Sequence, residues 1–120
     1  MEVSKVHDIS ILHLFGEVSL MEMDRIETAL RSFQNSNSKK ILIDMASVDY
    51  VHYFVIKRLV KKASLFREDE GDIKLVSLKN EVKEMIRFTG ADQFLEDYAT
   101  ISEAILSYLK PMGHDDRMYH

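Results

Sequence analysis

Hydrophobic residues change their spacing along this chain, between the two-residue period of strands and the three-to-four-residue period of helices. The first part alternates, weakly over Glu2–His7 and clearly over Ile9–Phe15. A polar pair, His7-Asp8, separates these runs, so the pattern predicts a β-hairpin. We expect Gly16 to break the second strand.

Helical spacing follows the hairpin. Ser19 is suited to cap a helix, because its hydroxyl can accept from the free N–H groups of the first turn. The turn-forming residues Asn35–Ser38 would end this helix. Four hydrophobic residues recur at helical spacing and predict a stripe that faces the core: Met23, Ile26, Leu30 and Phe33.

The stretch from Lys39 to Lys62 is the part around which we expect the fold to be organised. Lys40–Asp44 is an aliphatic run typical of a strand buried on both faces. We expect Met45–His52 to be a connection and Val55–Phe66 to be a helix with one apolar face. The opposite face of that helix is basic: Lys57, Arg58, Lys61 and Lys62.

The rest of the chain repeats the alternation. Ile73–Leu78 is a predicted strand, Asn80 is the predicted cap of a short helix, and Phe94–Tyr98 is a predicted edge strand. Thr100 would cap a last helix. The short helix should end at Gly90 and has an apolar side made of Val82, Met85, Ile86 and Phe88.

Strands that alternate with helices indicate an α/β fold with right-handed crossovers and a mainly parallel sheet. The opening hairpin adds an antiparallel pair, so the sheet should be mixed, with four to five strands and about four helices. We expect a single domain over residues 1–110. The segment 111–120 has little apolar content and should form a flexible tail.

Composition narrows the classes of function. The 120 residues carry a net charge of −4, which favours neither nucleic acid nor an anionic membrane as a partner. Cysteine is absent, and no apolar run is long enough to span a bilayer, so we expect a cytoplasmic protein. No catalytic motif, phosphate-binding loop or metal-ligand spacing is present. We therefore predict no enzyme activity, no cofactor and no metal.

The series from Ile43 to Ile56, IDMASVDYVHYFVI, resembles the signature of the STAS domain (sulfate transporter and anti-sigma factor antagonist). In that family an aliphatic-Asp-aliphatic strand end is followed, after a small-residue turn, by Asp-Ser-Ser-Gly at the start of a helix. Gly16-Glu17-Val18-Ser19 similarly resembles the family's Gly-Glu-Leu-Asp. The resemblance extends from about Ile9 to Leu109 and implies the STAS fold.

The resemblance also implies a change in regulation. In STAS proteins of the anti-sigma antagonist kind, a partner kinase phosphorylates the second Ser of the Ser-Ser pair or a Thr in its place. The matching position here is Phe54, which has no hydroxyl, so the phosphorylation motif is degenerate. Val55 replaces the glycine, and we expect its branched side chain to block close approach of an anion to the helix start.

The same region contains the candidate binding residues. Tyr50, His52, Tyr53 and Phe54 would form an exposed aromatic patch, because aromatic residues commonly anchor protein interfaces. The alternative is that Phe54 packs into the core. Three basic residues of the helix, Lys57, Arg58 and Lys61, would guide an acidic partner onto this surface, although a solvated helix face is the simpler interpretation.

Taken with the resemblance, these residues predict a non-enzymatic protein-interaction module in bacterial signalling. Its partner would be an anti-sigma factor or another histidine-kinase-like ATPase. Two alternatives stay open. The chain could have a structural role and form a homodimer or larger assembly through the aromatic surface. It could instead be a small-ligand-binding STAS domain with its site near Tyr50.

Overall fold

The computed structural model describes residues 1–109; the predicted tail at 111–120 lies outside the described residues. None of the helices in these residues is long and apolar enough to cross a membrane. In chain order the elements are β1 (Glu2–Val6), β2 (Ile9–Val18), α1 (Leu20–Asn35), β3 (Lys40–Val51), α2 (Tyr53–Glu68), β4 (Asp72–Val76), α3 (Asn80–Thr89), the 3-10 turn η1 (Ala91–Gln93), β5 (Asp97–Tyr98) and α4 (Ile101–Leu109).

The five strands form one sheet in the order β1-β2-β3-β4-β5. β1 and β2 are antiparallel, as expected of a hairpin, and the other neighbouring pairs are parallel. With four helices, this confirms the predicted α/β fold with a mixed, mainly parallel sheet.

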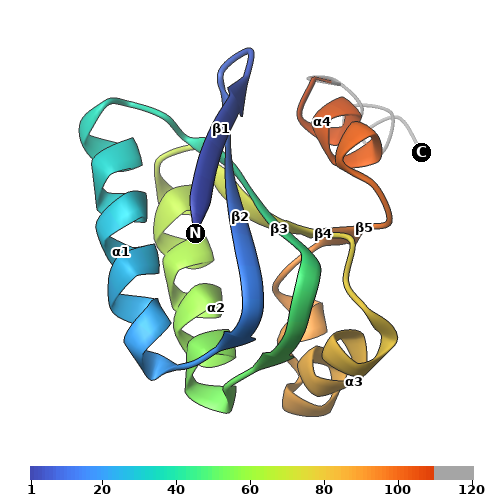
Figure 1. Cartoon of the computed structure of the whole chain (residues 1–120). Coiled ribbons are helices and arrows are strands. Elements are labelled where there is room, and N and C mark those ends of the chain that lie inside the picture. The colour runs from blue at the N-terminus through green and yellow to red at the C-terminus, as the bar shows by residue number, and fades with distance from the viewer. Residues whose placement is uncertain (110–120) are drawn as a thin grey trace.

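Helices cover both faces of the sheet. α1 and α2 lie side by side on one face, and α4 lies on the other (Figure 1). Ile41 and Ile43 of β3 belong to the core under α1, α2 and α3, whereas Leu42 belongs to the smaller core under α4. Consecutive residues of a strand point to opposite faces, so the aliphatic run of β3 is buried on both sides, as predicted.

The predicted ends of the two long strands were wrong. β2 continues through Gly16 to Val18, and β3 continues to Val51 through most of the predicted connection. The pairing of β2 with β3 shifts register at His13/Phe15 and at Gly16/Glu17, and Gly16 has a φ of 68°. These irregularities disturb the two-residue period: the buried residues at the end of β3 are Met45, Val48 and Val51, three apart.

Two of the predicted helix starts differ in detail. Ser19 occupies the N-cap position of α1, but its hydroxyl makes no capping hydrogen bond. Asn80 is the first residue of α3, and Lys79 precedes it as the N-cap residue. The prediction for Thr100 is confirmed, because its Oγ1 accepts a hydrogen bond from the backbone N–H of Glu103 at 3.1 Å.

Two predictions for the last third of the chain, in α3 and β5, need correction. Phe88 was expected on the apolar side of α3, but it is 92% exposed and lies outside the core. β5 contains only Asp97 and Tyr98, and Phe94 precedes it as an exposed residue after η1. Gly90 does end α3 as predicted, in the left-handed conformation that glycine adopts without steric cost.

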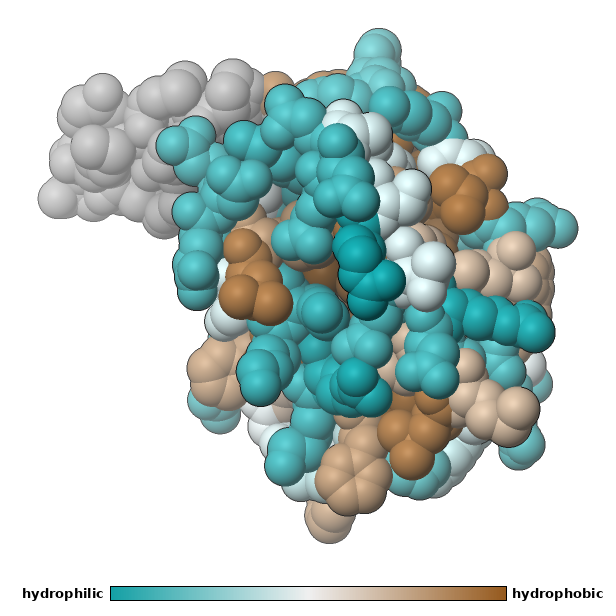
Figure 2. All heavy atoms as spheres, turned by 90° about the vertical axis from the view of Figure 1, so that its left-hand side faces the viewer, coloured by the Kyte–Doolittle hydropathy of each residue, from teal (hydrophilic) through white to brown (hydrophobic). Residues whose placement is uncertain are grey.

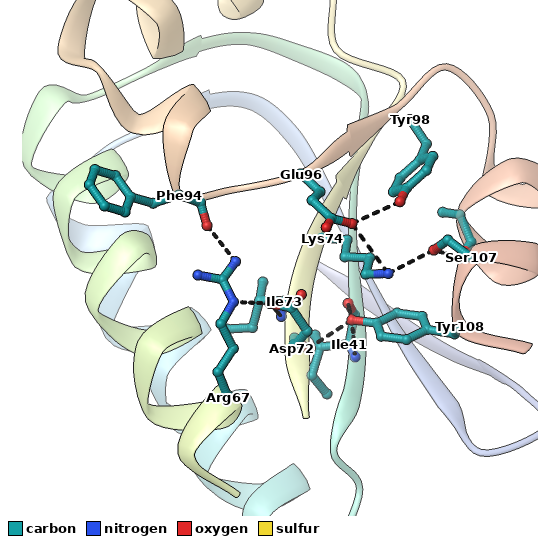
Figure 3. Close-up of polar contacts among 11 residues, drawn as sticks. Ile41, Arg67, Asp72, Ile73, Lys74, Phe94, Glu96, Tyr98, Ser107 and Tyr108 are labelled. Carbon is teal, nitrogen blue, oxygen red and sulfur yellow. Dashed lines mark hydrogen bonds and ion pairs between the residues drawn. The ribbon is translucent and has the colours of Figure 1, made fainter. Parts of the chain in front are cut away.

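A buried tyrosine fastens α4 to the sheet. The hydroxyl of Tyr108 lies 2.8 Å from the carbonyl oxygen of Ile41 and 2.9 Å from that of Asp72, and it accepts from the Ile41 N–H at 3.3 Å (Figure 3). The hydroxyl thus contacts the backbones of β3 and β4. Burial raises the pKa of Tyr108 above its usual value, so the neutral phenol is the form that the folded chain stabilises.

Lys74 lies beside this tyrosine and is almost fully buried (Figure 3). Its Nζ donates to Ser107 Oγ at 2.8 Å and lies 3.4 Å from a carboxylate oxygen of Glu96. The same ammonium group lies 4.2 Å from the ring centroid of Tyr108. A buried cation needs such partners, so these contacts make the position of α4 specific.

Candidate functional site

Two helices begin at the same end of the sheet, and a strand pair fixes their starts. Val18, the last residue of β2, pairs with Val51, the last residue of β3. The backbone N–H of His52 donates to the carbonyl oxygen of Val18 at 2.9 Å. α1 then begins at Leu20 and α2 at Tyr53, each two residues beyond the paired valines.

His52 caps α2. Its Nδ1 accepts a hydrogen bond from the backbone N–H of Phe54 at 3.2 Å. The N–H groups of Val55 and Ile56 donate to the His52 carbonyl oxygen, at 2.9 and 3.2 Å. His52 therefore satisfies N–H groups of Phe54, Val55 and Ile56 that a bound anion would otherwise compete for.

The expected role of Val55 was wrong. Its side chain is fully buried and belongs to the main core, so it does not stand in front of the helix start. The residue before it, Phe54, is the one that projects outward. Access of an anion to the first turn is therefore limited by the internal hydrogen bonds to His52, with no obstruction from Val55.

The aromatic residues at this end are exposed. Tyr50 is 43% exposed, Tyr53 48% and Phe54 51%, which excludes the alternative that Phe54 fills the core. The ring of Phe54 stacks on that of His52 at a centroid distance of 5.7 Å and meets that of Tyr53 edge-on at 5.5 Å. These contacts hold the aromatic side chains against each other without burying them.

Sequence reasoning missed two further hydrophobic residues at the same end. Leu20 and Met21 open α1 and are 44% and 79% exposed. Over α1 the surface is mainly hydrophilic, and hydrophobic side chains gather at its lower end (Figure 2), where α1 and α2 begin in Figure 1. Leu20 and Met21 lie outside the core-facing stripe that begins at Met23, and this was the signal in the sequence that could have indicated their exposure. The helix-start patch consists of Leu20, Met21, Tyr50, Tyr53 and Phe54.

The basic residues of α2 fall into two groups. Nη2 of Arg58 donates to both carboxylate oxygens of Glu27 on α1, at 2.7 and 2.8 Å, and Lys62 lies 3.9 Å from the same carboxylate. These two cations therefore help to join α2 to α1. Lys57 and Lys61 are exposed and take part in no ion pair within residues 1–109; the Nζ of Lys57 lies 5.4 Å from the ring centroid of Tyr53.

The acidic residues near the site have structural contacts. Asp44 Oδ1 accepts from the backbone N–H of Ala46 at 3.0 Å, so Asp44 holds the backbone of this segment. Asp49 pairs with Lys79 at 2.6 Å. Within residues 1–109, no three His, Asp or Glu side chains come together in a way that could hold a metal ion.

A mixed, mainly parallel sheet with helices on both faces defines the chain as an α/β domain. Residues 1–104 match the family model of the STAS domain. The chain belongs to the STAS domain family and resembles its anti-sigma factor antagonists. The resemblance seen in the sequence is thereby confirmed.

Relatives and solved structures agree with this assignment. BtrV of Bordetella bronchiseptica, named as a candidate anti-sigma factor antagonist, is 22% identical over 88 residues, which cover 73% of this chain and 76% of BtrV. A candidate anti-sigma factor antagonist of Thermotoga maritima superposes with a TM-score of 0.81 at 23% identity, covering 88% of this chain and 92% of that one. Unphosphorylated SpoIIAA of Bacillus gives 0.74 at 17% identity, covering 87% and 91%.

Proposed function

We propose that this chain is a non-enzymatic protein-interaction module of bacterial cytoplasmic signalling that binds its partner through the helix-start patch. The observation that carries this proposal is the exposure of three aromatic side chains, Tyr50, Tyr53 and Phe54, at one end of the fold. Burying such side chains against a partner would contribute much of the binding energy, as aromatic anchors commonly do.

The partner we propose is an anti-sigma factor or a related histidine-kinase-like ATPase. This choice rests on family membership and on the names of the relatives. Lys57 and Lys61 lie on α2 next to the patch and have no ion-pair partner within the part of the chain that the structure describes. Such cations can speed association with an acidic surface.

Phosphorylation would not control this binding. Phe54 occupies the position of the family's phosphorylated residue and has no hydroxyl group. It is also half-exposed at the start of the helix. A permanent aromatic side chain there makes the contact apolar, whereas a phosphate would add close to two negative charges. We therefore propose a module that is always competent to bind.

The proposal is tested with a candidate anti-sigma factor in a titration that measures Kd. Replacing both Tyr53 and Phe54 with Ala should weaken binding by about 2 kcal/mol or more, which is roughly 30-fold or more in Kd. Phe88→Ala is the matched control, because Phe88 is 92% exposed and lies on α3. Equal affinity of the double variant and the control would overturn the proposal.

Self-association through the same patch is the second candidate. The five residues of the patch are all exposed, so two copies could bury them against each other. Sedimentation of the protein alone distinguishes the candidates: a dimer that the double variant converts to monomer supports assembly. Ligand binding near Tyr50 stays a prediction.

A further inference from the structure

Three polar side chains from three neighbouring strands form a continuous row of hydrogen bonds. Ser4 of β1 lies with its Oγ 2.7 Å from Nε2 of His13 on β2. The other ring nitrogen of His13, Nδ1, lies 2.8 Å from Oδ2 of Asp44 on β3. β1, β2 and β3 are adjacent in the sheet (Figure 1), so the strand pairing brings these distant residues together.

In the neutral form of His13, the hydrogen bonds determine where the protons lie. A carboxylate oxygen can only accept, so Asp44 Oδ2 takes the Nδ1–H of a neutral His13. Nε2 is then left with a lone pair, and the hydroxyl of Ser4 donates its proton to it. The other oxygen of Asp44 accepts from the Ala46 N–H at 3.0 Å, which fixes the carboxylate in place.

The row lies on the face of the sheet that α4 covers only in part. Val6, Ile11 and Leu42 face the core under α4. Ser4, His13 and Asp44 lie two residues further along the same three strands, on the same face. Ser4 is exposed, whereas the side chains of His13 and Asp44 are 23% and 17% exposed. A reagent in solution can therefore reach the hydroxyl, while the base and the carboxylate are sheltered.

We propose that Ser4 is an activated nucleophile and a site of covalent acylation, with an activated carboxylic ester as the acyl donor. His13 would act as the base, and Asp44 would be a positioning residue that holds the tautomer of His13. A nucleophile bonded to a base that a third group orients is the arrangement that activates serine. This inference goes beyond the proposed function and uses no residue of the helix-start patch.

The step balances with the groups present. Ser4 Oγ attacks the acyl carbon, and its proton passes to Nε2 of His13. The bond between the acyl carbon and the leaving alkoxide breaks, and the alkoxide takes the proton from His13. The product is an ester at Ser4 and a free alcohol.

A fluorophosphonate probe tests the reactivity of Ser4 directly. The Oγ–P bond forms as the P–F bond breaks, fluoride leaves, and the serine proton passes to His13 and then to water. Peptide mapping by mass spectrometry should place the label on Ser4. Ser64 and Ser102 are internal controls in the same molecule, since both are exposed and neither bonds a histidine among residues 1–109. Equal labelling of the controls would overturn the proposal.

The Asp44→Asn variant distinguishes activation of Ser4 from a row of hydrogen bonds that has only a structural role. The amide oxygen of Asn can still accept from Ala46, but its NH₂ group would face Nδ1 and force the proton of His13 onto Nε2. Labelling should then fall by about 10²–10⁴-fold, the range that a general base contributes. The thermal midpoint, measured alongside, shows that the variant is folded. Two outcomes would overturn the proposal and leave the row as a link between strands only. One is a folded Asp44→Asn variant that is labelled as fast as the original protein. The other is an original protein that is labelled no faster than Ser4→Ala.

Discussion

Replacing Phe54 with Ala tests the structural basis of the candidate site more sharply than any other single change. Phe54 lies in the first turn of α2, is 51% exposed, and contacts the rings of His52 and Tyr53. The substitution removes a side chain that is half in water already. It leaves the backbone N–H of residue 54 free to keep its hydrogen bond to His52.

The expected cost in free energy of unfolding is small. Burying a phenylalanine side chain completely is worth about 1.5–3 kcal/mol, so half of that burial amounts to about 1 kcal/mol. Exposed ring contacts add about 0.5 kcal/mol at the low end of their range. The higher helix propensity of alanine offsets about 0.5 kcal/mol of this loss in the free energy of unfolding. The net destabilisation should therefore be about 1 kcal/mol, against about 3–5 kcal/mol for a phenylalanine in the core.

Thermal unfolding followed by circular dichroism at a fixed protein concentration measures this cost. About 1 kcal/mol corresponds to a fall in midpoint of roughly 3–6 °C for a chain of this size. Leu59→Ala is the matched control, because Leu59 is buried on the same helix and should cost about 2–5 kcal/mol. A fall of more than about 10 °C for Phe54→Ala would show that Phe54 is a core residue and refute the reasoning.

Three further predictions concern charge and modification. Incubation with a serine kinase that acts on STAS domains should leave Ser47 and Tyr53 unmodified. Stoichiometric phosphate on either residue, found by mass spectrometry, would contradict the proposal that phosphorylation does not control binding. Reversing the charges of Lys57 and Lys61 should slow association with the partner and flatten the salt dependence of the association rate in stopped-flow measurements. The free energy of unfolding should change by no more than about 0.5 kcal/mol. Unchanged association rates would mean that the two lysines are only a solvated helix face. Burial raises the pKa of Tyr108, so the free energy of unfolding should decrease as the pH rises above about 10. Tyr108→Phe should reduce that slope and cost about 1–3 kcal/mol at neutral pH, because backbone groups of β3 and β4 lose their partner.

The order and type of the elements could be predicted because the local signals were strong. The hairpin shows two alternating runs around a polar pair, the central strand is a continuous aliphatic run, and the stripe of α1 has helical spacing. The length of β3 could not be predicted, because its second half is shaped by irregular pairing with β2. A shift of register is a property of two strands together, and neither strand shows it alone.

The candidate site was predicted in part for a similar reason. Exposure of Phe54 could be proposed because aromatic residues commonly anchor protein interfaces, and the structure confirms it. The separate role of Arg58 required knowing that Glu27 faces it from α1. The row from Ser4 to Asp44 likewise depends on three strands meeting in one register, and no spacing along the chain indicates it.

The hydrogen bond between Val18 and His52 has a consequence for how tightly the helix-start patch can bind a partner. α1 and α2 start from one hydrogen-bonded point, and the ion pair of Arg58 with Glu27 joins them again six residues after His52. The residues of the helix-start patch are thus held in one relative arrangement before any partner arrives. Little backbone entropy is lost on contact, so the binding free energy should depend mainly on the side chains that become buried.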